Sequence, residues 1–339
     1  MREPLDPLDP LDPDDPVEPG WLIVVDPEGQ GERLDHLIAR RVPRLSRARA
    51  ARLEVVDLDH PARPLKKSLR VRAGQRLWVR RPPPDEDAEA LAPPEVLEEG
   101  GGLIVLNKPP GWAAHPTASR FEGAVTTWLR RRGTPAHPAH RLDVETSGVL
   151  LCASDPALDL EAKAAFKAHA VEKAYLAVCE GVPRDAAGAP RAAGDRWESR
   201  APLGFDPASA VRLKVGRVEV AAGGWEAHTR FELLEVRAAA GAAGRCLVRA
   251  EPRTGRQHQI RAHLALEGCP IVGDKLYGPD ERHFLDHLNG ALTPEALAAL
   301  GHPRQALHAA ELALTLGGRR RAWAAPLPEE LAALLVAPT

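Results

Sequence analysis

Cysteine is scarce in this chain of 339 residues, and no C-x-x-C pair occurs. The four cysteines are Cys152, Cys179, Cys246 and Cys269. They are far apart in sequence and each has apolar neighbours, which argues against structural zinc and predicts buried thiols in a reducing cytoplasm. The H-E-x-x-H pattern is also missing, and His258 and His263 are five residues apart rather than the four that align two imidazoles on one helix face. We therefore expect no metal site.

Long apolar runs are absent as well. The longest apolar stretches are far shorter than a membrane span, and the N-terminus does not combine a charged with an apolar segment as a signal peptide does. Apolar residues make up 44% of the chain and charged residues 27%, which is typical of a globular protein in solution. The sequence thus predicts a cytoplasmic protein without a membrane partner. Nothing in it indicates an obligate oligomer, so we expect a monomer.

The net charge of −2 conceals a strong segregation of charge. Residues 1–18 contain one arginine and seven acidic residues, whereas residues 32–81 contain 15 Lys/Arg and five Asp/Glu. Repeated Pro-Leu-Asp and like-charge repulsion predict a disordered acidic tail over residues 1–30. The tail is either a solubilising extension, the slightly favoured interpretation, or a segment that screens a basic domain from polyanions.

Residues 31–81 form the basic unit. Apolar positions from Leu34 onward have helical spacing, and Ser46 is a candidate cap for a second short helix. Segments 69–72 and 76–79 alternate like the strands of a hairpin. A small unit with this excess of positive charge is typical of a phosphate-backbone binder, although a merely solvated surface is the simpler alternative. The Pro-rich acidic stretch 82–99 is expected to be a linker between two domains.

The second domain is expected to cover residues 100–335 and to be α+β with a mixed or antiparallel sheet. Strands are predicted at 103–106, 149–153 and 173–178, and helices at 157–170 and from Thr293 to Gly301. The Ala/Gly/Pro-rich segment 183–210 has few periodic positions and is expected to be loop.

Polar residues concentrate in two stretches of this domain. Residues 140–148 carry Asp143 and Arg141 on a loop next to the apolar run 149–153. An isolated Arg-x-Asp is usually only a surface ion pair, but a carboxylate delivered by a core strand is also typical of catalytic loops. Residues 253–264 hold three arginines, whose guanidinium groups suit phosphate or carboxylate recognition. A third stretch, 273–278, is by itself a weak signal. His140, His258 and His308 are expected to support loops by hydrogen bonding.

Taken together, these stretches resemble a known family. The segments are HRLDVETSGVLLCA at 140–153, RTGRQHQIRAHL at 253–264, IVGDKLYG at 271–278, NKPPG at 107–111 and EKAYLAV at 172–178. In order and spacing they are similar to the RluA-type RNA pseudouridine synthases. Residues 31–81 resemble the alpha-L RNA-binding domain through 33–35, 45–47 and 73–75, and depart from it at 54–61, where an Asn-Gly hairpin is usual.

The resemblance implies a mixed, largely antiparallel sheet with flanking helices and a central cleft, and an enzyme without metal or cofactor. Asp143 matches the single catalytic aspartate, Tyr175 the tyrosine that stacks on the target uracil, and Arg261 the basic partner of the aspartate. Arg141 matches the arginine that replaces the flipped nucleotide or holds its phosphate. The expected RNA-binding residues are Arg141, Arg256, Arg33, Arg47, Arg49 and Arg52.

These residue types suit the implied reaction. One carboxylate suffices to break the N1–C1′ bond of uridine, either as a nucleophile or by starting an elimination. A neighbouring guanidinium lowers the pKa of that carboxyl, a flat uncharged ring can hold the detached uracil, and an arginine can fill the gap left by a flipped base.

Other functions stay open at this point. One is an RNA-binding or assembly protein without catalysis, and another is a nucleosidase-like hydrolase, although only one candidate carboxylate stands out where a glycoside hydrolase normally has two. Large-subunit ribosomal RNA is the expected substrate, because an alpha-L domain often precedes this catalytic type in ribosomal enzymes. Transfer RNA is the alternative.

Overall fold

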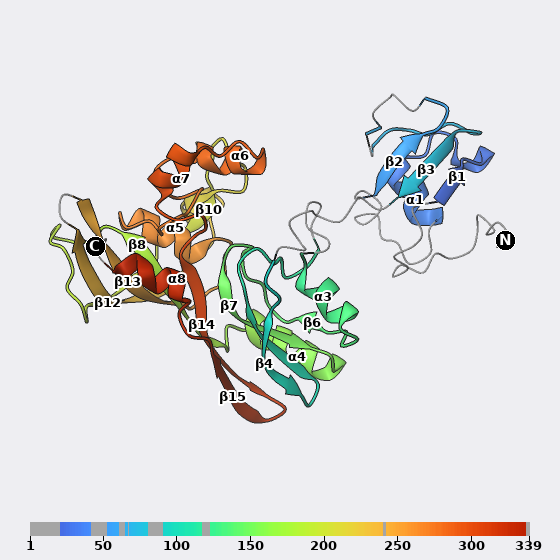
Figure 1. The fold of residues 1–339 in the computed structure, drawn as a ribbon. Coiled ribbons are helices and arrows are strands. Elements are labelled where there is room, and N and C mark those ends of the chain that lie inside the picture. The colour runs from blue at the N-terminus through green and yellow to red at the C-terminus, as the bar shows by residue number, and fades with distance from the viewer. Residues whose placement is uncertain are drawn as a thin grey trace. The chain divides into compact units, whose positions relative to one another are not determined.

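The computed structural model describes residues 21–41, 53–60, 65–66, 68–80, 91–116, 123–239 and 242–336. These fall into two compact units, one within residues 1–86 and one within residues 87–339 (Figure 1). Each unit has its own hydrophobic core, and each is considered by itself below.

The N-terminal unit is a three-stranded antiparallel sheet with one described α-helix. Its elements are β1 (Trp21–Val24), η1 (Pro27–Gly29), α1 (Leu34–Arg41), β2 (Glu54–Asp57) and β3 (Arg76–Arg80). Strand β3 lies between β1 and β2. The apolar side of α1 packs on the sheet through Leu34, Leu37 and Ile38, all fully buried, as the helical spacing predicts.

Two expectations for this region are wrong. The acidic tail does not extend to residue 30, because β1 pairs with β3 and residues 27–29 form a helical turn. Segment 69–72 is not a hairpin strand, since Arg70 makes only an isolated bridge to Arg33 and β3 finds its partners in β1 and β2. The reason is that alternation indicates a strand but not its partner. The expected second helix lies outside the described residues.

A ten-stranded sheet forms the centre of the second unit. Its strands are β4 (Glu95–Gly100), β5 (Leu103–Lys108), β6 (His137–Pro138), β7 (Ser147–Ala153), β8 (Glu172–Glu180), β9 (Arg196–Ser199), β12 (Thr229–Ala239), β13 (Ala242–Pro252), β14 (Leu307–Leu316) and β15 (Arg319–Ala324). The main order is β4-β5-β7-β14-β8-β13-β12-β9, with β6 on β7 and β15 on β14. Within the described part of the chain, β7 and β14 pair in parallel and the other pairs of this sheet are antiparallel. The expected mixed, largely antiparallel α+β fold is confirmed.

Short helices and a small hairpin flank this sheet (Figure 1). The helices are α3 (Val125–Arg131), α4 (Pro156–Lys167), α5 (Gln259–Leu266), α6 (Arg282–Leu288), α7 (Pro294–Leu300) and α8 (Glu329–Ala332), with single turns η2 (Val220–Ala222) and η3 (Ala333–Leu335). The hairpin pairs β10 (Leu203–Phe205) with β11 (Val215–Arg217). The expected helix at 293–301 is confirmed, because Thr293 caps α7 and Gly301 ends it in the left-handed conformation.

Strand β7 is the central element that positions the loop of Asp143. All seven of its residues are buried, as expected of a short apolar run between polar segments. Gly148 has a φ of +113°, and a Cβ there would lie 2.1 Å from the carbonyl oxygen of Ala309. Only glycine therefore lets β7 approach β14 so closely.

Two further boundaries need correction. The linker expected over 82–99 is wrong at its end, because β4 begins at Glu95 and pairs with β5. The loop expected over 183–210 contains β9 and β10; Trp197 of β9 is buried and stacks on Phe231 of β12 at 5.2 Å between ring centroids. The four cysteines are buried free thiols, as expected. In the described ranges we find no helix long and apolar enough to cross a membrane.

Candidate active site

Lys108 supports the loop that carries Asp143 through hydrogen bonds to backbone carbonyl groups. The Lys108 ammonium is fully buried and donates to the carbonyl oxygen of Val144 at 3.1 Å and to two carbonyls of its own segment at 3.0 Å. The Gly111 N–H donates to the same Val144 oxygen at 2.9 Å, and Thr146 N–H closes a turn on the carbonyl of Asp143 at 3.0 Å. The NKPPG segment is thus a support for this loop.

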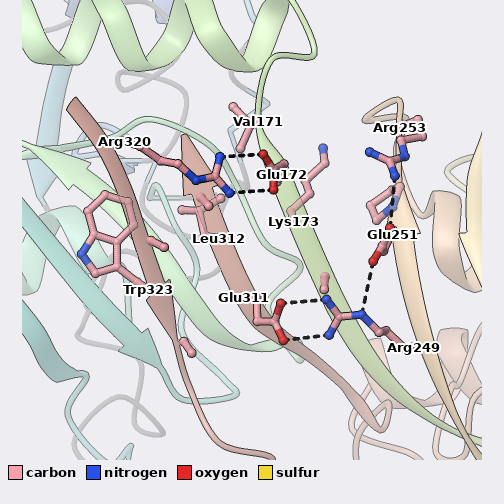
Figure 2. Close-up of a pocket in the computed structure, with 15 residues that line it drawn as sticks. Val171, Glu172, Lys173, Arg249, Glu251, Arg253, Glu311, Leu312, Arg320 and Trp323 are labelled. Atoms are coloured by element: carbon pink, nitrogen blue, oxygen red, sulfur yellow. Dashed lines mark hydrogen bonds and ion pairs between the residues drawn. The ribbon is translucent and has the colours of Figure 1, made fainter. Parts of the chain in front are cut away.

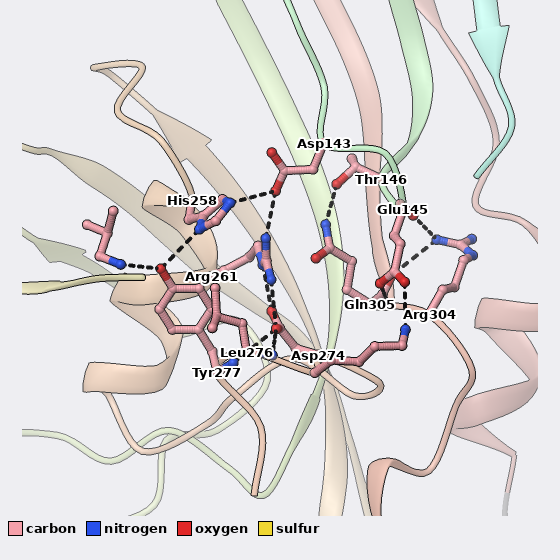
Figure 3. A network of polar contacts seen from close by, with 12 residues as sticks. Asp143, Glu145, Thr146, His258, Arg261, Asp274, Leu276, Tyr277, Arg304 and Gln305 are labelled. Atoms are coloured by element: carbon pink, nitrogen blue, oxygen red, sulfur yellow. Dashed lines mark hydrogen bonds and ion pairs between the residues drawn. The ribbon is translucent and has the colours of Figure 1, made fainter. Parts of the chain in front are cut away.

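Glu145 anchors the other side of the loop (Figure 3). Its carboxylate accepts a bond from Lys275 Nζ at 2.6 Å and one from the backbone N–H of Gln305 at 3.2 Å. The Arg304 guanidinium donates to the backbone carbonyl of Glu145 at 3.1 Å, and the Gln305 amide donates to Thr146 Oγ1 at 2.7 Å. Glu145 is therefore a structural contact of the loop.

Arg261 of α5 lies between two carboxylates, Asp143 and Asp274 (Figure 3). Its Nη1 donates to Asp143 Oδ2 at 2.9 Å, while Nε and Nη2 donate to the two oxygens of Asp274 at 2.6 and 2.8 Å. Asp274 is completely buried and also accepts the N–H groups of Leu276 and Tyr277. This double contact fixes the guanidinium in one orientation toward Asp143.

The charges explain the ionisation of this cluster. Burial alone would raise the pKa of Asp143, but the positive charge of Arg261 and its hydrogen bond outweigh burial and hold that pKa below its usual value. Burial would likewise lower the pKa of Arg261, yet Asp274 and Asp143 raise it above its usual value. Asp143, whose side chain is 27% exposed, is thus a carboxylate at neutral pH that solvent or substrate can reach.

Tyr175 presents an uncharged ring near this carboxylate. It lies on β8 opposite Ala250 of β13 and Ala309 of β14, and its ring is only partly buried between two core clusters. Burial, and secondarily the charge of Asp143, raises the pKa of Tyr175 above its usual value. The phenol is therefore neutral over the working pH range, as an aromatic platform for a base requires.

The expected RNA-binding arginines differ in their exposure and in their hydrogen-bond partners. Arg141 is exposed, and its charge lowers the pKa of His258, behind the larger effects of burial and Arg261, which shows that it lies near the Asp143 cluster. Arg256 is exposed and donates to the carbonyl of Glu226 at 3.0 Å. Arg33 pairs with Asp35 in the N-terminal unit through two bonds of 3.0 Å. Arg47, Arg49 and Arg52 lie outside the described residues.

Sequence reasoning missed several residues around Asp143. They are Asp274, Lys275 and Tyr277, which lie in the stretch 273–278, whereas His258 was expected only to support a loop. His140 and His308 do support the backbone, as expected: His140 Nε2 accepts the Leu151 N–H at 3.1 Å, and His308 Nε2 lies 3.1 Å from the Ala325 carbonyl oxygen. The signal for Asp274 was the GDKLYG stretch, which is too short to indicate more than a turn.

A polar groove of about 620 Å³ lies over β8, β13, β14 and β15 (Figure 2). Its charges largely neutralise one another: Arg249 pairs with Glu311 through two bonds of 2.7 Å, and Arg320 pairs with Glu172 at 2.7 and 2.9 Å. Lys173 is different, because burial is the cause that shifts its pKa and no carboxylate among the described residues contributes. Its Nζ lies 3.6 Å from the position that a Cβ on Gly255 would occupy, so it faces the turn before α5.

Within the described residues no group of three or more His, Cys, Asp or Glu side chains is arranged to hold a metal ion. The polar centre consists instead of one reachable carboxylate, a guanidinium fixed beside it and a neutral aromatic ring. Such a centre can attack or deprotonate a sugar carbon and hold a detached planar base.

Comparison with known proteins agrees with this class of enzyme. The family model described as RNA pseudouridylate synthase matches residues 102–266. The chain is 31% identical to "Ribosomal large subunit pseudouridine synthase D" of Nitrosomonas europaea over 91% of this chain and 84% of that protein. It is 32% identical to an "Uncharacterized RNA pseudouridine synthase" of Chloroflexus aurantiacus over 93% of this chain and 92% of that protein.

Among solved structures, human RNA Pseudouridylate Synthase Domain Containing 1 has the same fold, with a TM-score of 0.55 and 23% identity over 71% of this chain and 87% of that one. The chain therefore belongs to the RNA pseudouridine synthases, in the RluA-type family. It is an isomerase whose substrate is RNA.

Proposed function

We propose that this enzyme converts specific uridines of large-subunit ribosomal RNA to pseudouridine, with Asp143 as its catalytic group. The observation that carries the proposal is the bond of 2.9 Å between the Arg261 guanidinium and the partly exposed carboxylate of Asp143. Arg261 keeps Asp143 ionised, and the buried contact with Asp274 keeps Arg261 in place.

In the reaction, the N1–C1′ bond of the flipped uridine breaks and a C5–C1′ bond forms. The hydrogen on C5 is lost as a proton and N1 gains a proton, so the product has the same composition as the substrate. Asp143 acts at the sugar, by attack on C1′ or by removing the proton from C2′. Tyr175 stacks against the detached uracil, and its neutral phenol adds no charge that would hold the base in one orientation.

RNA binding is assigned to the exposed arginines and to Lys173. Arg141, which is exposed, would fill the gap left by the flipped base, and Arg256, also exposed, would contact the RNA backbone beside it. Lys173 points to the same side of β8 as Tyr175 two residues later, because side chains alternate along a strand. Burial lowers the pKa of Lys173, and an RNA phosphate would supply a counter-charge. The remaining assigned contacts are Arg33, Arg47, Arg49 and Arg52 of the N-terminal unit.

Ribosomal RNA is favoured because several similar proteins carry that substrate in their names. Transfer RNA is the alternative, since residues 54–61 depart from the usual N-terminal hairpin. We propose further that the enzyme acts as a monomer in the cytoplasm, where it would meet precursor ribosomal RNA.

Mapping pseudouridine in total RNA by carbodiimide treatment and primer extension tests the substrate. The strains to compare are wild type, a deletion, and the deletion complemented with wild type, Asp143→Asn or Asp280→Asn. Asp280 is a matched control, since its carboxylate forms a salt bridge with the exposed Arg282. We expect large-subunit stops that vanish in the deletion and return with wild type and Asp280→Asn but not with Asp143→Asn. Loss of stops only in transfer RNA would refute the ribosomal substrate.

A further inference from the structure

His258 occupies a backbone conformation that a side chain other than glycine rarely adopts. It is the residue immediately before α5, and its φ is +53°. Among the described residues His169 is the other non-glycine with a positive φ, and it lies on the exposed surface after α4. Holding a histidine in this region costs free energy, and such strain concentrates at functional sites. The contacts of the imidazole indicate what the strain supports.

The contacts of both ring nitrogens of His258 favour a proton on Nε2, because Tyr277 can donate to Nδ1 and a lone pair on Nε2 would face the Asp143 carboxylate. The backbone N–H of Val215 donates to the Tyr277 hydroxyl oxygen at 2.9 Å. The hydroxyl proton is therefore free to be donated, and the acceptor at hand is His258 Nδ1 at 3.2 Å. A neutral imidazole that accepts at Nδ1 has its proton on Nε2.

That Nε2–H group faces the catalytic carboxylate. His258 Nε2 lies 4.0 Å from Asp143 Oδ2, the same oxygen that Arg261 contacts at 2.9 Å (Figure 3). Neither contact involves Oδ1. A separation of 4.0 Å is longer than a hydrogen bond, but catalytic contacts are often long in the free enzyme and shorten when substrate binds.

The imidazole is neutral at working pH, because its surroundings disfavour a second proton. Burial and then the positive charge of Arg261 lower the pKa of His258 to about 4, although Asp143 and Asp274 act in the opposite direction. The groups that face this pair are Arg261, Arg141, Asp274, Tyr175, Tyr277 and Gln305.

We infer that His258 is a positioning residue for Asp143, with its tautomer fixed by Tyr277, and that His258 and Arg261 together orient the carboxylate through Oδ2 for its reaction with the sugar. This inference rests on the proposed function, in which Asp143 is the catalytic group. A neutral donor orients the carboxylate without removing its charge. A series of contacts from Val215 through Tyr277 and His258 to Asp143 links the orientation of the Asp143 carboxylate to β11, which is far from Asp143 in sequence.

The test uses His258→Asn, which tolerates a positive φ, and His169→Asn as the matched control in the same backbone conformation. Turnover is measured as release of tritium from C5 of uridine in transcribed ribosomal RNA, over a range of pH. We expect His258→Asn to lower kcat about ten- to hundredfold with KM unchanged, as for loss of a hydrogen bond to a charged group. His169→Asn should leave both parameters unchanged.

The pH profile separates positioning from a merely structural role. A donor to a carboxylate favours its charged form, so removal of the His258 donor raises the pKa of Asp143 and moves the acid limb of kcat/KM to higher pH. Tyr277→Phe, which keeps the imidazole, should lower kcat by less and move the limb in the same direction. An unshifted acid limb in both variants, or a change in KM alone, would overturn the inference.

A measurement that does not depend on catalysis distinguishes failure of the inference about His258 from failure of the proposed function. In ¹⁵N-histidine-labelled protein, the His258 signals, assigned by their loss in His258→Asn, should report protonation at Nε2. Tyr277→Phe should give a mixture of tautomers. Protonation at Nδ1 in the wild type would refute the proton assignment even in an active enzyme, whereas a wild type that releases no tritium from any RNA would refute the proposed function.

Discussion

Replacing Asp274 by asparagine should strongly destabilise the unit within residues 87–339, because Asp274 has no contact with solvent. The Asp274 carboxylate is completely buried and accepts two bonds from Arg261 and two from backbone N–H groups. Asparagine keeps the size but places an NH₂ group against the guanidinium or the backbone donors. Removing one partner of a buried ion pair costs about 3–5 kcal/mol. For a domain of this size, that corresponds to a fall in Tm of roughly 6–20 °C.

Thermal unfolding at neutral pH measures this effect, with Asp280→Asn as control. Asp280 also contacts an arginine through two bonds, but Arg282 is 80% exposed, and such pairs rarely contribute measurably. The pKa of Asp274 is lowered in the folded protein, despite a burial effect that would raise it, because Arg261 outweighs burial. Its contribution to stability is therefore present above the unfolded pKa of about 3.9 and is lost as the pH falls through the lower, folded value.

The difference in Tm between wild type and Asp274→Asn should accordingly be constant at neutral pH and shrink only below about pH 4. At about 2–4 °C per kcal/mol, a Tm of Asp274→Asn within 2 °C of wild type at neutral pH would mean a loss of about 1 kcal/mol or less. That result would refute the reasoning that the buried pair with Asp274 holds Arg261 in place.

Three further substitutions test other parts of the site. Lys173→Gln should weaken RNA binding and reduce the salt dependence of the Kd by about one released ion. The control Lys167→Gln, on the exposed side of α4, should change neither quantity. Equal effects of the two substitutions in a filter-binding titration would contradict a specific contact of Lys173. Tyr175→Leu keeps an apolar side chain of similar bulk in β8 but removes the flat ring. We expect kcat to fall at least tenfold at nearly constant Tm, since removing an aromatic ring costs about 1–3 kcal/mol of binding free energy per stacked base. Full activity of this variant would refute stacking on Tyr175. Glu145→Gln should weaken its bond to Lys275, lower Tm and reduce kcat. The acid limb should not move, since the proposed mechanism assigns the titrating carboxyl to Asp143. A moved limb would implicate Glu145 in the chemistry.

Local patterns in the sequence sufficed for elements whose determinants are close together. The apolar run 149–153 after Gly148 predicts β7, and Thr293, Pro294 and Gly301 predict the limits of α7. Elements with distant partners were not predictable in this way. Strand β9 depends on Phe231 of β12, and β3 pairs with β1 and β2 rather than with the segment next to it in sequence.

The same distinction holds for the site. The motif resemblance led to Asp143, Arg261 and Tyr175, because each lies within a recognisable stretch. The supporting contacts depend on residues that meet only in the folded chain, since Arg261 and Asp143 are 118 residues apart and Val215 and Tyr277 are 62 apart. Nothing in the sequence indicates that His258 has a positive φ or which of its nitrogens carries the proton.

Tritium release from RNA labelled at C5 of uridine tests the central claim most directly, because formation of the C5–C1′ bond expels that hydrogen. Purified wild-type enzyme and Asp143→Asn, matched for Tm, are incubated with transcribed large-subunit ribosomal RNA. The account predicts release by the wild type, with no loss of uracil from the RNA, and no release by Asp143→Asn. Release at an equal rate by Asp143→Asn, or free uracil as the product, would contradict it.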